Sequence, residues 1–303
     1  MKNLLIPIIL LSLLFASCGQ SVEEQRRISK AERQRLKTED SLALKVAVLP
    51  TLDCLPLYLA KDKRWFDTLD VDVRLRRFTA QMDCDTALLG KSVEGMVTDL
   101  VRAERMRREG TALTYLTSTN AYWLLITNRK ARIKKVDQLG DKMVAMARYS
   151  VTDHLTDKTL KGVKTSSMVF RIQVNDVNVR LAMLLNNEMD AMWLTEPQAA
   201  LARQAGNPVI SDSRSFRHSY GAIVFRTDAV GDSRRKSQMA KFVKAYNRAC
   251  DSLTQRGLLP YSDVLEKYYK LTATDVKALP KLKFTHVQKP KEADLADCRQ
   301  TTR

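Results

Sequence analysis

Short apolar runs alternate with stretches of helical apolar spacing along most of the chain. The runs predict buried strands at residues 45–49, 71–75, 95–98, 112–116, 123–127, 144–147, 170–174 and 191–194. Apolar residues three or four positions apart predict helices at residues 57–66, 86–89, 177–185 and 196–205. Alternation of this kind indicates mainly parallel sheets flanked by helices, which is the α/β fold class.

The first residues depart from this alternation. A cationic start at residues 1–3 precedes an apolar run at 4–16, and small residues then lead to Cys18. This order is typical of an export signal, and the run is too short to cross ~30 Å of hydrocarbon. It resembles the signal of bacterial lipoproteins, in which the cysteine thiol is acylated, although Phe15 stands where leucine is usual. We expect a signal peptide at 1–17 and a palmitate-type lipid anchor on Cys18, with an ordinary cleaved signal as the alternative.

Residues 18–44 carry many charges and almost no apolar face. Such a stretch contains helix-forming residues but cannot join a hydrophobic core. We expect it to be a tether between the lipid anchor and the folded body. A partner helix of a coiled coil is the alternative, but Ile28, Ala31 and Leu36 are too sparse to form a seam.

Composition narrows the classes of function. Of the 303 residues 45% are hydrophobic, which excludes a disordered chain, and no run after the signal approaches a membrane span. The formal net charge is +17, but the basic residues are spread along the chain without interleaved aromatic side chains. We therefore expect no nucleic acid partner, and we interpret the charge as solvated faces with some attraction to an anionic cell envelope.

Four cysteines follow Cys18 in the sequence. An even number in an oxidising compartment permits two disulfides, and the candidate pairs are Cys54–Cys84 and Cys250–Cys298. Free buried thiols are the alternative, and the sequence leaves this question open. The three histidines are scattered and no metal-ligand spacing occurs, so we expect neither a metal nor a cofactor.

Four short motifs follow one another between residues 45 and 282. They read L-P-L-Y-L-A and W-F within 55–66, D-T-A-L-L-G and V-E-G within 85–95, V-D-Q-L-G-D-K-M-V-A at 136–145, and M-D-A and E-P within 189–197. In this order they resemble the type II periplasmic solute-binding proteins of ABC importers, in the branch that includes thiamine-precursor, aliphatic-sulfonate and taurine receptors. Two departures are Arg64, where the family usually has glycine, and residues 148–152, which lack the family's glycine-serine turn. The second departure puts a backbone-amide anion cradle in doubt.

The resemblance implies two α/β lobes with a ligand cleft between them. Lobe one then comprises residues 45–120 and 219–280, lobe two residues 121–218, and residues 281–303 form a C-terminal tail whose structure the sequence leaves open. The resemblance further implies a periplasmic or extracytoplasmic, lipid-anchored monomer. Such a protein closes on a small-molecule solute and presents it to an ABC permease, so we expect no catalytic residues.

Candidate ligand-binding residues follow from position in the fold, because ligands of open α/β sheets lie beyond the carboxyl ends of the strands. Loops at these positions and the two crossovers between the implied lobes supply Asp53, Gln81, Asp83, Thr98, Asp99, Asn120, Tyr122, Ser150, Thr152, Glu196 and Tyr220. For Asp83, Asp99, Ser150 and Thr152, the alternative role is to cap a following helix.

The candidate residues and the family resemblance point to different charges on the ligand. Their carboxyl groups favour a solute with hydrogen-bond donors or positive charge, such as an amino-heteroaromatic compound. Because neighbours on a strand alternate faces, only one of Tyr122 and Trp123 can stack on a flat solute, and we expect Tyr122 to do so. The resemblance also allows sulfonates, so the sequence leaves the charge open.

Two other functions remain as alternatives. One is a sensor or surface lipoprotein that keeps the fold without a transporter. The other is an enzyme, because the same fold serves a pyrimidine-forming enzyme of thiamine synthesis and enzymes of the menaquinone pathway. The chain has neither the cysteine-rich iron motif of the former nor a G-x-S-x-G nucleophile motif. We therefore expect a binding protein.

Overall fold

The computed structural model describes residues 30–300, which fall into two units, 30–43 and 44–300. The expected signal peptide, Cys18 and the first part of the tether lie outside the described residues. The first unit contains helix α3 (Lys30–Leu42), where Arg35 pairs with Glu32 at 2.6 Å and with Glu39 at 3.8 Å. Within the part of the chain that the structure describes, every helix is too short or too polar to cross a membrane.

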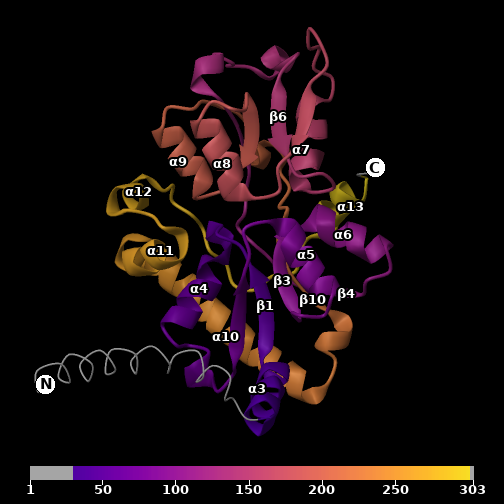
Figure 1. Cartoon of the computed structure of the whole chain (residues 1–303), viewed down its shortest axis with the longest axis vertical. Helices are drawn as coiled ribbons and strands as arrows, with labels where there is room; N and C mark the ends of the chain where they lie inside the picture. The colour runs from indigo at the N-terminus through magenta and orange to yellow at the C-terminus, as the bar shows by residue number, and fades with distance from the viewer. Residues whose placement is uncertain (1–29, 301–303) are drawn as a thin grey trace, which may run out of the picture. The chain divides into compact units, whose positions relative to one another are not determined.

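The strands of residues 44–300 form two five-stranded sheets (Figure 1). The first sheet has the order β2-β1-β3-β10-β4, from β1 (Leu44–Val48), β2 (Val73–Arg77), β3 (Gly95–Asp99), β4 (Leu113–Ser118) and β10 (Gly221–Arg226). The second has the order β7-β6-β8-β5-β9, from β5 (Leu124–Thr127), β6 (Met143–Met146), β7 (Phe170–Gln173), β8 (Ala191–Leu194) and β9 (Val209–Asp212). Only β10 in the first sheet and β5 in the second run against their neighbours. The predicted α/β class with mainly parallel sheets is confirmed.

Helices cover each sheet, and each sheet with its helices is called a lobe below. Lobe one is the first sheet with α4 (Leu55–Asp62), α5 (Gln81–Leu89), α6 (Leu100–Arg108) and α10 (Ser233–Arg256). Lobe two is the second sheet with α7 (Val151–Leu160), α8 (Val177–Leu185) and α9 (Gln198–Gln204). Helices α11 (Ser262–Tyr269) and α12 (Ala273–Ala278) follow α10, and they pack on α4 and α9 respectively.

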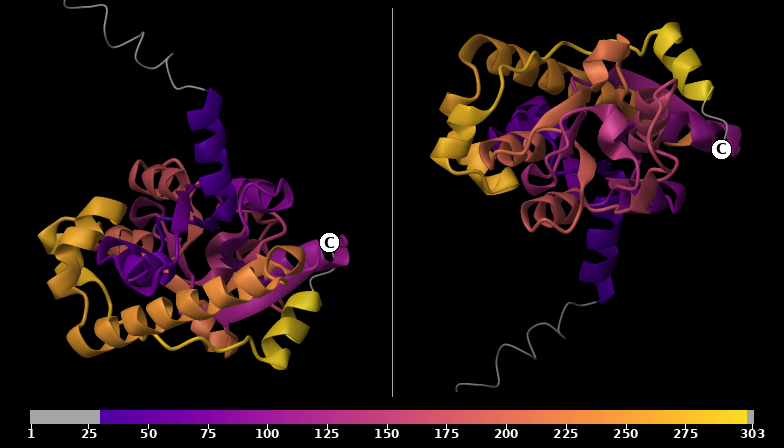
Figure 2. Two further views of the ribbon diagram at one scale, coloured as in Figure 1. Left: turned by 90° about the horizontal axis from the view of Figure 1, so that it is seen from below. Right: turned by 90° about the horizontal axis from the view of Figure 1, so that it is seen from above.

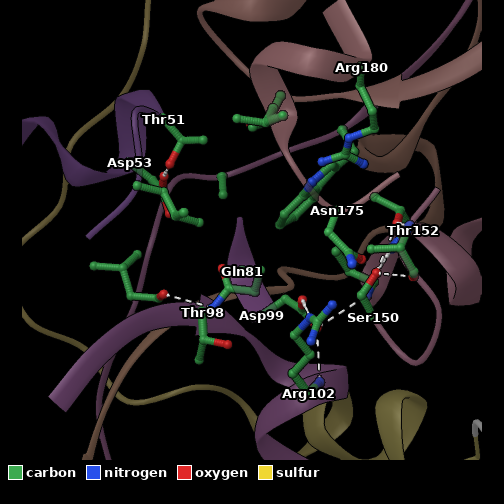
Figure 3. A pocket seen from close by; sticks show the side chains of 18 of the residues that line it. Thr51, Asp53, Gln81, Thr98, Asp99, Arg102, Ser150, Thr152, Asn175 and Arg180 are labelled. Atoms are coloured by element: carbon green, nitrogen blue, oxygen red, sulfur yellow. Dashed lines mark hydrogen bonds and ion pairs between the residues drawn. The ribbon is translucent and has the colours of Figure 1, made fainter. Parts of the chain in front are cut away.

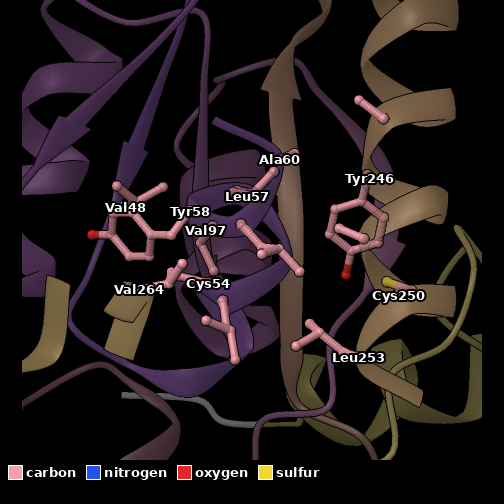
Figure 4. Packing of buried hydrophobic residues seen from close by; sticks show 14 of the residues in the cluster. Val48, Cys54, Leu57, Tyr58, Ala60, Val97, Tyr246, Cys250, Leu253 and Val264 are labelled. Atoms are coloured by element: carbon pink, nitrogen blue, oxygen red, sulfur yellow. The ribbon is translucent and has the colours of Figure 1, made fainter. Parts of the chain in front are cut away.

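Helix α10 shows how an apolar stripe builds the core of lobe one. Its residues Phe242, Tyr246 and Leu253 recur at helical spacing and are buried. The ring of Phe242 stacks on Phe66 with centroids 5.6 Å apart and meets Phe225 edge-on at 5.7 Å. Figure 4 shows the same helix directing Tyr246 and Leu253 toward the apolar residues that cover the sheet. The long helix is therefore held to the sheet mainly by apolar packing.

The four cysteines of the described residues are buried free thiols, so neither candidate disulfide forms. Cys54 belongs to the apolar cluster around α10, whereas Cys84 belongs to a second cluster. Successive residues of β1 alternate between these clusters, which places them on opposite faces of the first sheet. Cys250 and Cys298 are divided in the same way. The first sheet thus separates the thiols of both candidate pairs.

The C-terminal tail, which the sequence left open, ends in helix α13 (Glu292–Arg299), packed on α6 (Figure 2). Asp297 of α13 accepts hydrogen bonds from Tyr220, just before β10, at 3.0 Å and from His154 and Lys158 of α7 at 2.8 and 2.5 Å. Burial alone favours a raised pKa for Asp297, but the bonds from Lys158, His154 and Tyr220 outweigh it and lower the pKa. Helix α13 therefore ties lobe one to α7 of lobe two.

Candidate functional site

A cavity of about 60 Å³ lies between the two lobes. Its walls contain the last residues of β3 and segments that follow β1 and β2 in lobe one and β6, β7 and β8 in lobe two, so the carboxyl ends of parallel strands from both sheets meet there. Figure 3 labels polar side chains of the wall, among them Thr51, Asp53, Gln81, Thr98, Asp99 and Arg102 of lobe one and Ser150, Thr152, Asn175 and Arg180 of lobe two. Apolar side chains, among them Val97 and Trp123, complete the lining.

Backbone hydrogen bonds join the lobes around this cavity. The N–H of Leu52 donates to the carbonyl of Glu196 at 2.8 Å, and the N–H of Val177 donates to the carbonyl of Thr79 at 3.2 Å. Each bond connects a segment of lobe one with a segment of lobe two. The two lobes are therefore in a closed arrangement.

Asp99 caps a helix in each lobe, and its side chain lines the cavity. Its Oδ1 accepts from the N–H of Arg102 in the first turn of α6 at 2.9 Å and from the N–H of Val151 at the start of α7 at 3.1 Å. Burial raises the pKa of Asp99 to about 6, although the nearby Arg102 guanidinium opposes the shift. The predicted site role and the predicted capping role thus coincide at one carboxylate.

The positive charge of Arg102 is compensated within lobe one. Its guanidinium forms a buried ion pair with Asp85 and lies 3.6 Å from the second carboxylate oxygen of Asp99. Burial raises the pKa of Asp85, and Arg102 opposes this rise by stabilising the carboxylate. With two carboxylates as neighbours, Arg102 brings no net positive charge to the cavity.

Arg180 of α8 is different, because it forms no ion pair within 4 Å among the described residues, and Asp176 acts on its charge only at longer range. Its residue surface is only 7% exposed, yet its Nε and Nη1 atoms have no hydrogen-bond partner within the described residues. Burial and, to a smaller extent, the charge of Arg102 lower the pKa of Arg180 to about 10, while the carboxylate of Asp176 at the start of α8 opposes the shift. The guanidinium is therefore still charged at neutral pH. Sequence reasoning missed this residue, although a signal was present: an arginine three residues after Val177 and four before Leu184, on the apolar face of α8.

Asp53 has both carboxylate oxygens occupied by hydroxyl donors of lobe one. Thr51 donates to one oxygen at 2.6 Å and Thr119 donates to the other at 3.0 Å. Burial raises the pKa of Asp53, and these two hydrogen bonds oppose the rise. The carboxylate lines the cavity as expected, but its two hydrogen bonds are made inside the protein.

Ser150 and Thr152 begin helix α7 and also line the cavity. Ser150 Oγ accepts from the N–H of Thr152 at 3.1 Å, and Thr152 Oγ1 accepts from the N–H of Ala147 at 2.9 Å. Since Asp99 already takes the N–H of Val151, the first amides of α7 have acceptors in the protein. This arrangement leaves few free amides at the start of α7 for an anion, as the missing glycine-serine turn led us to expect.

Tyr122 and Glu196 lie outside the cavity lining and bind each other. The Tyr122 hydroxyl donates to the Glu196 carboxylate at 2.7 Å, and Arg203 pairs with the same carboxylate at 2.9 Å. The guanidinium of Arg214 lies 4.1 Å from the centroid of the Tyr122 ring. Trp123, its neighbour on the chain, faces the cavity instead. Both residues precede strand β5, and the structure gives the cavity Trp123 rather than the expected Tyr122.

The remaining candidates are divided between the cavity and its surroundings. Gln81 and Thr98 line the cavity, and the Thr98 hydroxyl is buried without a hydrogen-bond partner among the described residues. Asp83 lies in a neighbouring groove, and Asn120 lies in a groove beside the C-terminal tail. Tyr220 is buried and binds Asp297.

Comparison with known proteins places the chain in a family. A family model described as NMT1/THI5 like matches residues 51–256, whereas no curated protein matches the sequence. The alkanesulfonate-binding protein SsuA from Xanthomonas axonopodis pv. citri, solved with MOPS, has a TM-score of 0.70 at 17% identity, over 85% of this chain and 90% of that one. The ligand-binding component of an ABC-type import system from Staphylococcus aureus has a TM-score of 0.69 at 14% identity, over 85% and 90%. The nitrate-binding protein NrtA from Synechocystis PCC 6803 has a TM-score of 0.65 at 15% identity, over 82% and 74%.

At these identities the likeness to solved structures concerns the fold. The expected two-lobed architecture of periplasmic binding proteins is confirmed, since each structure is matched over most of its length. The predicted resemblance to the branch with sulfonate receptors is confirmed as well.

Proposed function

Since this chain belongs to the NMT1/THI5-like family and has the fold of importer binding proteins, we propose that it is the solute-binding component of an ABC-type importer. The supporting observation is the cavity at the carboxyl ends of strands from both lobes, with a polar lining that each lobe supplies. A solute held there touches both lobes at once. Contacts that exist only when the lobes are together shift the open–closed equilibrium toward the closed arrangement.

The proposed partner is a permease that recognises the closed lobes. We propose the lobe limits expected from the sequence, with hinges near residues 120 and 219 where the chain crosses between the sheets. Among the described residues that line the cavity there is no histidine, cysteine or lysine. The function we propose is therefore capture and release of a solute by a monomer, without chemical change.

Attachment to the cell envelope is part of the proposal. The signal-like residues 1–17 and Cys18 support a lipid anchor on the extracytoplasmic face of a membrane. Mass spectrometry of the mature protein should find residue 18 as the acylated N-terminus. The variant Cys18→Ala should leave the folded body unchanged and lose the acyl mass.

An amino-heteroaromatic solute has little support from the cavity. Tyr122, expected to stack on it, is engaged by Glu196 and Arg214 away from the lining. Asp53, expected to bind its donors, has both oxygens occupied by threonine hydroxyls. That ligand stays a prediction from the sequence.

The test begins with protein purified under native conditions, from which bound small molecules are released and identified by mass spectrometry. Calorimetry with the identified compound should give saturable binding, and small-angle scattering should show compaction on its addition. Thr98→Phe, which fills the cavity, should abolish binding, whereas Thr114→Phe on the exposed surface of β4 should not. Chemical turnover of the bound compound, or binding that survives Thr98→Phe, contradicts the proposal.

A further inference from the structure

We propose that the cavity selects a singly charged organic anion, a small carboxylate or sulfonate, and that Arg180 binds its charged group. This inference rests on the proposed solute-binding function and adds the class of solute. It begins from the guanidinium of Arg180, which is at least nine-tenths buried and whose Nε and Nη1 lack partners among the described residues. A buried cation that forms no ion pair and leaves two N–H groups without acceptors is costly to the fold, even with Asp176 at longer range. A ligand that brings the missing negative charge removes that cost.

The chemistry of the guanidinium fits this ligand class. Its planar fork of N–H donors matches the two oxygens of a carboxylate or sulfonate. Figure 3 shows Arg180 reaching from α8 of lobe two toward the cavity, which Thr98 lines from lobe one. Thr98 contributes a buried hydroxyl that also lacks a partner. An anion that binds both residues joins the two lobes, so its binding is coupled to closure.

The other charges of the cavity limit the ligand to one negative charge. Arg102 is already compensated by Asp85 and Asp99, so Arg180 is the cation of the lining that no carboxylate of the described residues pairs with. Asp53 and Asp99 line the same cavity, and their carboxylates repel a second negative charge on the ligand. A cationic ligand, in contrast, meets the buried guanidinium.

The apolar part of the lining favours an organic ligand over an inorganic ion. Val97 of lobe one and Trp123 and Val177 of lobe two form the wall beside the polar groups. The cavity of about 60 Å³ leaves room for only a short apolar group next to the anion. These walls stabilise a short aliphatic or small planar group by removing it from water.

The experiment measures binding of matched compounds by calorimetry and thermal shift. The panel contains short alkyl carboxylates and sulfonates, the corresponding neutral amides and primary amines, and nitrate and phosphate. We expect saturable binding of members of the two organic anion classes, with the amides and amines at least about tenfold weaker. Arg180→Gln should weaken anion binding roughly ten- to a hundredfold, and Arg180→Lys should restore part of it. Arg148→Gln, which removes an exposed arginine of lobe two, should change it less than about twofold.

Failure of this inference differs from failure of the solute-binding proposal. If an amide, an amine or an inorganic ion binds as tightly as the anions, or if Arg180→Gln leaves affinity unchanged, the inferred class is wrong while solute binding stands. If the protein releases no compound by mass spectrometry and binds no member of the panel, solute binding itself fails. Thermal unfolding shows that Arg180→Gln is folded, and we expect a melting temperature no lower than that of the wild type, since the variant removes an uncompensated buried charge.

Discussion

Replacing Asp297 by asparagine should weaken the link that α13 makes between the lobes. The carboxylate accepts hydrogen bonds from His154, Lys158 and Tyr220 at 2.8, 2.5 and 3.0 Å. A hydrogen bond to a charged group contributes about 1.5–3 kcal/mol, and a neutral one about 1 kcal/mol. Asparagine keeps one oxygen in place, and the Lys158 side chain is 23% exposed and can bind water instead. We therefore expect Asp297→Asn to lower the free energy of unfolding by about 2 kcal/mol.

The assay is urea and thermal unfolding of both proteins at pH 7. For a chain of this size, a loss of about 2 kcal/mol corresponds to a fall in melting temperature of roughly 4–8 °C. Glu292→Gln on the same helix is the matched control, because Glu292 is 74% exposed where it pairs with Arg299. That variant should change the free energy of unfolding by less than about 0.5 kcal/mol. If both variants lose the same free energy of unfolding, the argument that burial makes the hydrogen bonds of Asp297 stabilising is wrong.

The pH dependence gives a second check of the same reasoning. The pKa of Asp297 is lowered in the folded state, so its stabilising contribution is present above its unfolded pKa, ordinarily near 3.8, and is lost as pH falls through the folded pKa. Burial lowers the pKa of His154 and Asp297 opposes that shift, so the variant loses more stability than the wild type as His154 gains a proton. The gap in stability between the wild type and Asp297→Asn should therefore not narrow, and can only widen, from pH 7 to 5. It should narrow below pH 4, and a gap that persists at the lowest measurable pH contradicts the assignment.

Three further outcomes can be measured on the same protein. Burial raises the pKa of Asp99 to about 6, and the ionised carboxylate repels an anionic ligand. Calorimetry should therefore show anion affinity rising as pH falls from 7 to 5, and Asp99→Asn should remove most of this pH dependence. An anion affinity that falls as pH falls contradicts this prediction. Phe242→Ala, which removes the ring packed between Phe66 and Phe225, should cost about 3–5 kcal/mol in urea unfolding; a loss below about 1 kcal/mol tells against tight packing there. Alkylation in denaturant without reductant should label every cysteine beyond Cys18, because the structure has no disulfide among its described residues; a reductant-dependent increase in labelling sinks this expectation.

The strands were predictable where short apolar runs marked them. The predicted strands through residue 194 all occur, with ends shifted by at most two residues, as at β2 and β4. Strand β9 escaped prediction because its sequence V-I-S-D is short and only half-buried at a sheet edge. The buried strand β10 and the amphipathic helix α10 had equally clear patterns, but both lie beyond the last predicted element.

The site was predictable only as far as position along a strand determines it. Thr98 and Asp99 end strand β3, Asp53 and Ser150 come shortly after β1 and β6, and the parallel sheets bring these strand ends to one cavity. Tyr122 and Trp123 precede β5 in the segment that crosses between the lobes, and which of them faces the cavity depends on tertiary packing that no local pattern contains. Arg180, to which we assign the charged group of the ligand, lies on helix α8 rather than in a loop after a strand.

The double acceptor role of Asp99 makes one backbone amide a natural reporter of lobe motion. The N–H of Val151 is held by an oxygen from the opposite lobe, whereas the N–H of Arg102 is held by the same oxygen within its own lobe. Separation of the lobes exposes the first of these amides to water and leaves the second protected. The ratio of their deuterium exchange rates therefore measures how often the lobes of the unliganded protein separate, with the N–H of Arg102 as the internal standard.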